Sequence, residues 1–187
     1  TTSFDLTIGE AGYATLYLGC AVTIPAGVEA YAVSEVDEWA VLSPVTGAIP
    51  ANEAVILKKA EGQPTDATTY KFNYAEIATA VESNLLEGTT IDTHIAGTAY
   101  VLGYINVAGE GEEERKEVGL YKAVLNADAT GATGESHFKN NANKAYLVVP
   151  GASEVASYSF RFGEGTTGVD EVKGENGNVK VIYDLTG

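Results

Sequence analysis

The chain of 187 residues contains one cysteine, two histidines and no methionine. A disulfide needs two thiols, so Cys20 forms none within the chain, and its apolar neighbours Leu18 and Val22 predict a small buried side chain. His94 and His137 are far apart and follow no ligand spacing, which argues against a zinc site and a Ser-His-Asp triad. The composition therefore argues against zinc-dependent or nucleophilic catalysis.

Basic residues are also scarce, because 11 Lys and Arg stand against 26 Asp and Glu, a formal net charge of −15. A negative field of this size repels phosphate backbones and anionic lipid headgroups, so we expect no nucleic-acid partner. No apolar run reaches the length of about 20 residues that a membrane-spanning helix needs. We therefore do not expect a transmembrane protein.

The chain begins at Thr1 without a methionine, from which we expect a mature or excised piece of a longer protein, with any signal peptide removed. Apolar residues make up 45% of it and charged residues 20%, which predicts a globular rather than a disordered protein. A chain of this length buries a large core without disulfides, so the lack of disulfides is compatible with an extracellular location.

What the sequence does contain is a succession of short segments in which apolar residues recur at every second position, the period of a strand with one buried face. The clearest are residues 70–74, 158–162 and 179–185. Strands are expected at 13–18, 21–24, 29–34, 38–43, 54–59, 69–74, 99–107, 118–124, 144–149, 155–162 and 178–185. Turn residues separate them, which predicts an all-β fold, an antiparallel β-sandwich of Greek-key or jelly-roll type.

One segment changes period, since Ile77, Val81 and Leu85 recur at every fourth position before Gly88 and predict one short helix. Residues 109–117 are expected to form a charged hairpin tip or loop, and residues 126–143 a long surface loop.

The composition also suggests where the domain ends. Residues 1–163 are predicted to form the β-sandwich domain, and 164–177 have the composition of a linker. Residues 178–187 are expected to begin a truncated C-terminal strand or tail module.

The best metal candidate is a sequence that imitates a calcium-binding loop, with Asn126, Asp128 and Thr130 at its first ligand positions. Its twelfth position holds His137 instead of a glutamate, so we expect no metal site. Carboxylates are numerous, but no two are marked as a glycosidase pair, and the glycines form no phosphate-binding loop. We therefore expect no cofactor and no enzymatic activity.

Aromatic residues are the remaining functional candidates, because sugar rings stack on exposed Trp or Tyr side chains beside hydrogen-bonding groups. Most of the 11 tyrosines lie on alternating strands and are expected in the core or at its rim. Trp39 follows the acidic residues Glu35 and Asp37, so these three residues are our candidate ligand-binding set.

Several motifs together resemble a known β-rich domain. They are GYATLYL (12–18), AVTIPAGVEAY (21–31), GAIPANEAVIL (47–57), NLLEGT (84–89), YVLGY (100–104), GLYK (119–122) and NKAYLVVP (143–150). In this order they resemble an uncharacterised accessory domain near the C-termini of large surface or secreted proteins of gut and oral Bacteroidetes. The resemblance implies that Gly12, Gly27 and Gly47 occupy turns. It also implies a missing tail related to sorting domains, since family members continue beyond the position that corresponds to Gly187.

From the resemblance and the lack of catalytic residue types we expect a non-catalytic module, extracellular or on the outer cell surface. Its role would be spacing, anchoring or cell adhesion, with neighbouring domains of the parent protein, and a host glycan or protein, as partners. One alternative is a glycan-binding module that stacks sugars on Trp39. Another is a fimbria-like structural subunit that exchanges its last strand.

Overall fold

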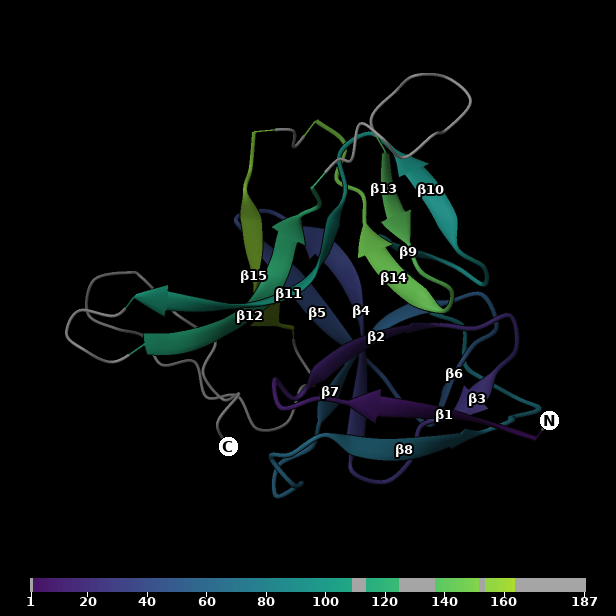
Figure 1. Cartoon of the computed structure of the whole chain (residues 1–187). Helices are drawn as coiled ribbons and strands as arrows, with labels where there is room; N and C mark the ends of the chain where they lie inside the picture. Colours follow the sequence, from purple (N-terminus) through teal and green to yellow (C-terminus); the bar gives the residue numbers. More distant parts are fainter. Residues whose placement is uncertain (1, 109–113, 125–136, 152–153, 164–187) are drawn as a thin grey trace.

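The computed structural model describes residues 2–108, 114–124, 137–151 and 154–163, and the side chains of these residues except 105–108, 114–116 and 137. These residues form an all-β fold (Figure 1). The strands are β1 (Ser3–Ile8), β2 (Tyr13–Tyr17), β3 (Val22–Thr23), β4 (Val28–Val36), β5 (Trp39–Val45), β6 (Ala48–Ile49), β7 (Ala54–Lys59), β8 (Thr68–Asn73), β9 (Leu86–Thr89), β10 (Thr93–Ala96), β11 (Tyr100–Ala108), β12 (Glu114–Lys122), β13 (His137–Asn140), β14 (Lys144–Leu147) and β15 (Ser157–Phe162).

Nine of the strands form one curved sheet in the order β2-β7-β4-β5-β15-β12-β11-β14-β9. All neighbours in it are antiparallel except β15 and β5, which run parallel, so the sheet is mixed. The sheet curls until its two ends meet, because β2 lies against both β9 and β14 (Figure 1). The result is a nearly closed barrel, and the expected two-sheet antiparallel sandwich is not confirmed.

The barrel is closed by individual hydrogen bonds instead of a regular ladder, along a line that we call the seam, between β2 and residues 143–145. The Tyr17 amide donates to the carbonyl of Asn143 at 3.0 Å, and Asn143 Nδ2 donates to the carbonyl of Tyr17 at 3.0 Å. The Ala145 amide donates to Oγ1 of the buried Thr15 at 3.1 Å. Side chains therefore satisfy backbone groups where the sheet leaves its edges unpaired.

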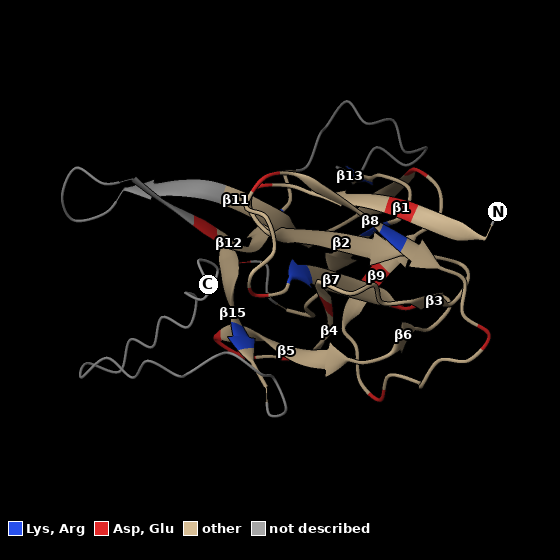
Figure 2. Ribbon diagram, turned by 90° about the horizontal axis from the view of Figure 1, so that it is seen from below, with Lys and Arg blue, Asp and Glu red and all other residues tan. Residues whose placement is uncertain are grey.

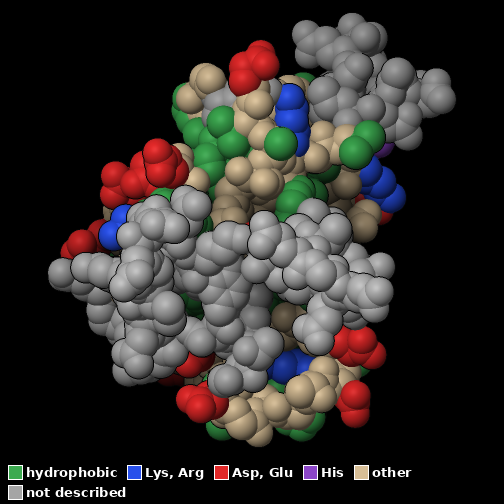
Figure 3. Space-filling model, turned by 90° about the vertical axis from the view of Figure 1, so that its left-hand side faces the viewer, with side chains coloured by type: hydrophobic (Ala, Val, Ile, Leu, Met, Phe, Trp, Pro, Cys, Tyr) green, Lys and Arg blue, Asp and Glu red, His purple; other side chains and the backbone are tan. Residues whose placement is uncertain are grey.

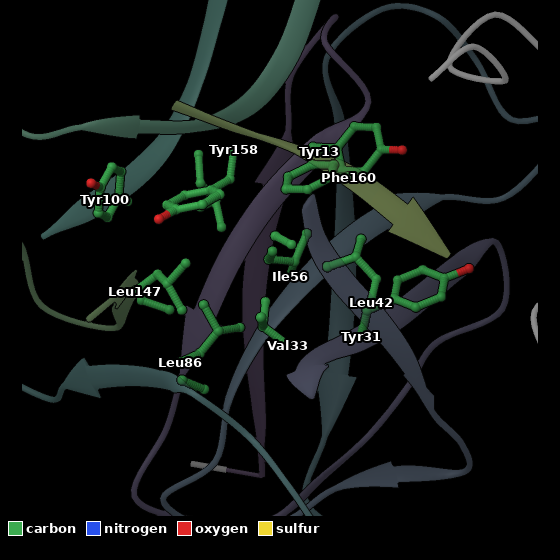
Figure 4. Packing of buried hydrophobic residues seen from close by; sticks show 14 of the residues in the cluster. Tyr13, Tyr31, Val33, Leu42, Ile56, Leu86, Tyr100, Leu147, Tyr158 and Phe160 are labelled. Atoms are coloured by element: carbon green, nitrogen blue, oxygen red, sulfur yellow. The ribbon is translucent and has the colours of Figure 1, made fainter. Parts of the chain in front are cut away.

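The barrel interior is a core of residues that come from all nine strands of the sheet. It consists of Tyr13, Tyr31, Val33, Ala40, Leu42, Ala54, Ile56, Leu86, Tyr100, Val118, Leu120, Ala145, Leu147, Tyr158 and Phe160. Figure 4 shows many of these side chains pointing toward one another from opposite sides of the barrel. The rings of Tyr100 and Tyr158 meet edge to face at 4.9 Å between centroids. Strand β15 thus places two aromatic residues in the centre of the fold.

Smaller two-stranded sheets cover the outside of the barrel. The pair β1–β8 packs its inward residues Ile8, Tyr70 and Phe72 against the outer face of β2, β7 and β4, together with β3–β6. The pair β10–β13 covers β11 and β14 through a third cluster around Phe138 and Tyr146. In Figure 1 these two ribbons lie at opposite ends of the barrel.

All ten expected strands within the described residues are confirmed, with small shifts at their ends. The turn glycines Gly12, Gly27 and Gly47 adopt positive φ angles of 79°, 84° and 76°, as the motifs implied. Part of the expected surface loop is strand β13, and Glu114 to Glu117 of the expected charged loop belong to β12. The segments 164–177 and 178–187, with the expected last strand, lie outside the described residues.

The expected helix after β8 is not confirmed, because residues 75–85 form no regular secondary structure and bend at Glu76 and Glu82. The Leu85 amide donates to the carbonyl of Val33 at 2.8 Å, and Ser83 Oγ donates to the carbonyl of Ser34 at 3.0 Å. These bonds lie beside a bulge in β4, beyond the part of β4 that pairs with β7. Ile77 is 86% exposed, so the apolar spacing did not mark a buried helix face.

Cys20 is exposed, which corrects the expectation of a buried thiol. Cys20 lies after the end of β2, outside the core stretch that its apolar neighbours Leu18 and Val22 suggested. In the described part of the chain, no helix has the length and apolar character needed to cross a bilayer.

Candidate functional site

The structure places the predicted ligand-binding residues Glu35, Asp37 and Trp39 at the hairpin turn between β4 and β5. Asp37 Oδ1 accepts a hydrogen bond of 2.8 Å from the Trp39 amide, and the Asp37 amide donates to the carbonyl of Trp39 at 3.1 Å. Trp39 is half-buried and paired with Ser159 of β15, whereas Glu35 and Asp37 are exposed. The Asp37 carboxylate therefore shapes the turn, and the indole lies partly within the sheet.

The other chemistry-bearing residues from the sequence do not converge on a metal site. Asn126, Asp128 and Thr130 lie outside the described residues. His94 and His137 lie on the neighbouring strands β10 and β13, where His137 pairs with Ala96. In the part of the chain that the structure describes, no group of three His, Cys, Asp or Glu side chains is arranged to hold an ion.

A cleft of about 530 Å³, which we call the seam cleft, lies among the described residues. Residues of β1, β2, β11, β13 and β14 line it, together with Ala123 and Val124 after β12. It therefore lies along the β14 side of the seam, under the β10–β13 ribbon. Its polar lining residues, besides Tyr13, are Thr7, Thr15, Lys139, Asn140, Asn141 and Lys144.

Asn140 is the most deeply buried polar side chain of the seam cleft, with 3% of its surface exposed. Its Nδ2 donates to Thr89 Oγ1 at 2.8 Å and to the carbonyl of Lys144 at 3.0 Å. Its Oδ1 accepts no hydrogen bond from any described residue. A buried acceptor without a donor is unfavourable by about 1–3 kcal/mol, so this oxygen favours a ligand or water that donates a hydrogen bond.

The charge of the seam cleft differs from that of the whole molecule. Figure 2 marks acidic residues on many parts of the described ribbon and fewer basic ones, and Figure 3 shows acidic side chains at several places on the face that it draws. The described lining of the cleft contains Lys139 and Lys144 but no Asp or Glu. The site therefore combines amide, hydroxyl and ammonium groups.

Lys139 is held by an ion pair beside the seam cleft. Its Nζ lies 2.7 Å from Asp92 Oδ2, and Asp92 Oδ1 accepts a hydrogen bond of 2.9 Å from the Ala142 amide. The hydrogen bonds from Lys139 and Ala142 lower the pKa of Asp92. Asp92 thereby ties β10 to the turn after β13 and stays ionised, which fixes that side of the cleft.

On the same strand as the lining residues Lys144 and Ala145, Tyr146 donates a hydrogen bond of 3.1 Å to Glu87 Oε2 across the β14–β9 pair. Burial, followed by the bond to Glu87, raises the pKa of Tyr146 to about 12. The phenol therefore stays protonated at neutral pH and acts as a structural donor.

A second, smaller groove of about 390 Å³ lies between β4–β5 and residues 79–83. Its serine hydroxyls are already engaged, since Ser43 Oγ donates to Ser34 Oγ at 2.7 Å and Ser83 Oγ donates to the carbonyl of Ser34 at 3.0 Å. The irregular segment that replaces the expected helix forms one side of the groove. We regard the seam cleft as the stronger candidate because it contains the buried acceptor.

Sequence reasoning did not find the seam cleft. Its polar residues come from strands that are far apart in the chain, and Asn140 and Asn141 lie in a stretch that reads as a loop. The three comparisons with known proteins found nothing similar, since no protein family, no curated protein and no solved structure matches this chain.

Proposed function

We propose that the chain is a non-catalytic, adhesion-type accessory module of a larger extracellular or cell-surface protein, and that it binds a glycan in the seam cleft. The resemblance to accessory domains of Bacteroidetes surface proteins supports the location. The observation that carries the binding role is the buried Asn140, whose Oδ1 lacks a donor among the described residues. Neighbouring domains of the parent protein would be its other partners.

The chemistry of the seam cleft suits a sugar better than an apolar ligand. A sugar hydroxyl both donates and accepts hydrogen bonds, so it can satisfy Asn140 Oδ1 and the exposed amide of Asn141. The C–H face of a sugar can pack against the half-buried Val101 on the same lining. The volume of about 530 Å³ lies within the range of small-molecule sites.

The rival glycan site at Trp39 makes a different prediction. Trp39 does not line the seam cleft, so a ligand in the cleft should leave the emission of this single tryptophan unchanged. A ligand stacked on the indole should shift it. The fimbria-like alternative depends on residues 178–187, which lie outside the described residues, and stays a prediction.

The test is a glycan array with the intact chain, followed by calorimetry on any glycan that binds. The variant Asn141→Ala removes an exposed amide of the cleft, and Asn73→Ala removes an exposed asparagine at the end of β8 as the matched control. Loss of one or two ligand hydrogen bonds should weaken binding about tenfold in Asn141→Ala alone. A blank array with folded protein would refute the glycan role and leave spacing or anchoring.

A further inference from the structure

The positive lining of the seam cleft indicates what kind of sugar it selects. The chain carries a formal net charge of −15, so its long-range field disfavours any anion. Lys139 and Lys144 nevertheless lie together on a lining that contains no acidic residue among those the structure describes. At physiological ionic strength charges are screened beyond about 8 Å, so a bound ligand interacts mainly with these local cations.

The two lysines differ in whether an acidic residue neutralises the charge of the ammonium group. Asp92 neutralises Lys139 through the ion pair of 2.7 Å. Lys144 is bound through its backbone, since its amide donates to Asn141 at 3.2 Å and its carbonyl accepts from Asn140 at 3.0 Å. Its ammonium forms no ion pair with any residue in the described ranges. Among the described lining residues, Lys144 is therefore the cation that lacks a counterion.

We propose, on the basis of the proposed glycan-binding role, that the seam cleft selects an anionic sugar, whose carboxylate or sulfate binds the Lys144 ammonium. The same backbone bonds that hold residues 140–144 together place Lys144 next to Asn140 and Asn141, which bind the hydroxyls. A lysine presents a mobile point charge on a flexible stem, so it accepts either acidic group. The half-buried position of Lys144 shields the contact from salt more than an exposed pair.

The experiment is an NMR titration of the intact chain, following the side-chain amide signals of Asn140 and Asn141. The ligands are matched pairs: glucuronate with glucose, galacturonate with galactose, and galactose 6-sulfate with galactose. The variant Lys144→Gln keeps a polar stem without the charge. Lys71→Gln removes an exposed lysine of β8 that does not line the cleft, and serves as the matched control.

We expect at least one acidic sugar to bind about tenfold more tightly than its neutral partner, with Lys144→Gln removing that difference and Lys71→Gln preserving it. Neutral-sugar affinity should be unchanged in Lys144→Gln. Preference for carboxylated sugars alone would assign a uronic acid, and preference for the sulfated sugar alone a sulfated glycan.

Two results would overturn the charge assignment while leaving the glycan role intact. One is equal binding of acidic and neutral sugars to the unaltered chain. The other is an equal loss of both in Lys144→Gln. If no sugar of either kind shifts the amide signals and the glycan array is blank, the proposed function itself fails.

Discussion

Gly88 of β9 provides the sharpest test of how the barrel closes, because it lies directly against Tyr17 at the seam. A β-carbon built on Gly88 would lie 2.4 Å from Cβ and Cγ of Tyr17 and 2.5 Å from its Cδ2. Ordinary contacts between carbon atoms are about 3.5–4.0 Å. The substitution Gly88→Ala therefore requires Tyr17 or β9 to move by about 1 Å or more.

Neither side of this contact moves freely. Tyr17 is bonded through its amide and carbonyl to Asn143, each at 3.0 Å, and Gly88 pairs with Ala145 in the β14–β9 ladder. Overpacking of this kind destabilises the folded protein by about 1–3 kcal/mol. Alanine also restricts the unfolded chain more than glycine does, which offsets about 0.4–1 kcal/mol of that loss. We expect Gly88→Ala to lower the free energy of unfolding by about 1–2 kcal/mol.

Urea unfolding followed by Trp39 fluorescence measures this loss. The matched control is Gly9→Ala, because no atom lies within 4 Å of a β-carbon at Gly9 and its φ is not in the left-handed region. The control should stay within about 0.5 kcal/mol of the unaltered chain or become slightly more stable. If Gly88→Ala unfolds at the same urea concentration as Gly9→Ala, the close approach of Tyr17 to β9 does not hold the seam.

Asn84→Ala removes a carboxamide that makes four hydrogen bonds, so urea unfolding should show that the free energy of unfolding falls by about 2–4 kcal/mol. A fall below about 1 kcal/mol would contradict the role of Asn84 as the anchor of residues 75–85. Lys59→Met removes the ammonium that donates to two loop carbonyls, which should lower the free energy of unfolding by about 1–3 kcal/mol and speed amide exchange in residues 60–67. Unchanged amide exchange would show that Lys59 does not hold this loop. The pKa of Tyr146 is about 12 in the folded chain and 10.0 when exposed, so its contribution to stability is complete below pH 10 and is lost as the pH rises through 12. Tyr146→Phe removes the titrating phenol and should flatten this alkaline fall in the urea midpoint, and an unchanged pH profile would exclude Tyr146 as its cause.

Local patterns were sufficient for the strands because burial on one face imposes a period of two residues. The segment 54–59 coincides with β7, and the other expected strands differ only at their ends. Strand β1 was missed although Phe4, Leu6 and Ile8 alternate in it, whereas β6, β9, β10 and β13 are too short for a period to appear. Short strands owe their existence to partners that lie far away in the chain.

The predicted helix shows where local reasoning fails. The spacing of Ile77, Val81 and Leu85 matches a helix, but only Val81 packs against a core cluster. Asn84 Oδ1 accepts from the amides of Val33 and Leu86 at 3.3 and 3.1 Å, which holds the end of the irregular segment beside β4. These long-range bonds outweigh a helix propensity of a few tenths of a kcal/mol per residue.

The sequence by itself determined the all-β class, most strands, the turn glycines and the strongly negative charge, because composition and periodicity are local properties of the chain. Only the tertiary structure decided that the sheet curls into a nearly closed barrel and that its edges meet at Tyr17 and Asn143. The same folding placed Lys144 and Asn140 on one cleft with residues of β1 and β2. A site of this kind depends on sheet curvature and on which strands become neighbours, and no short stretch of sequence encodes either.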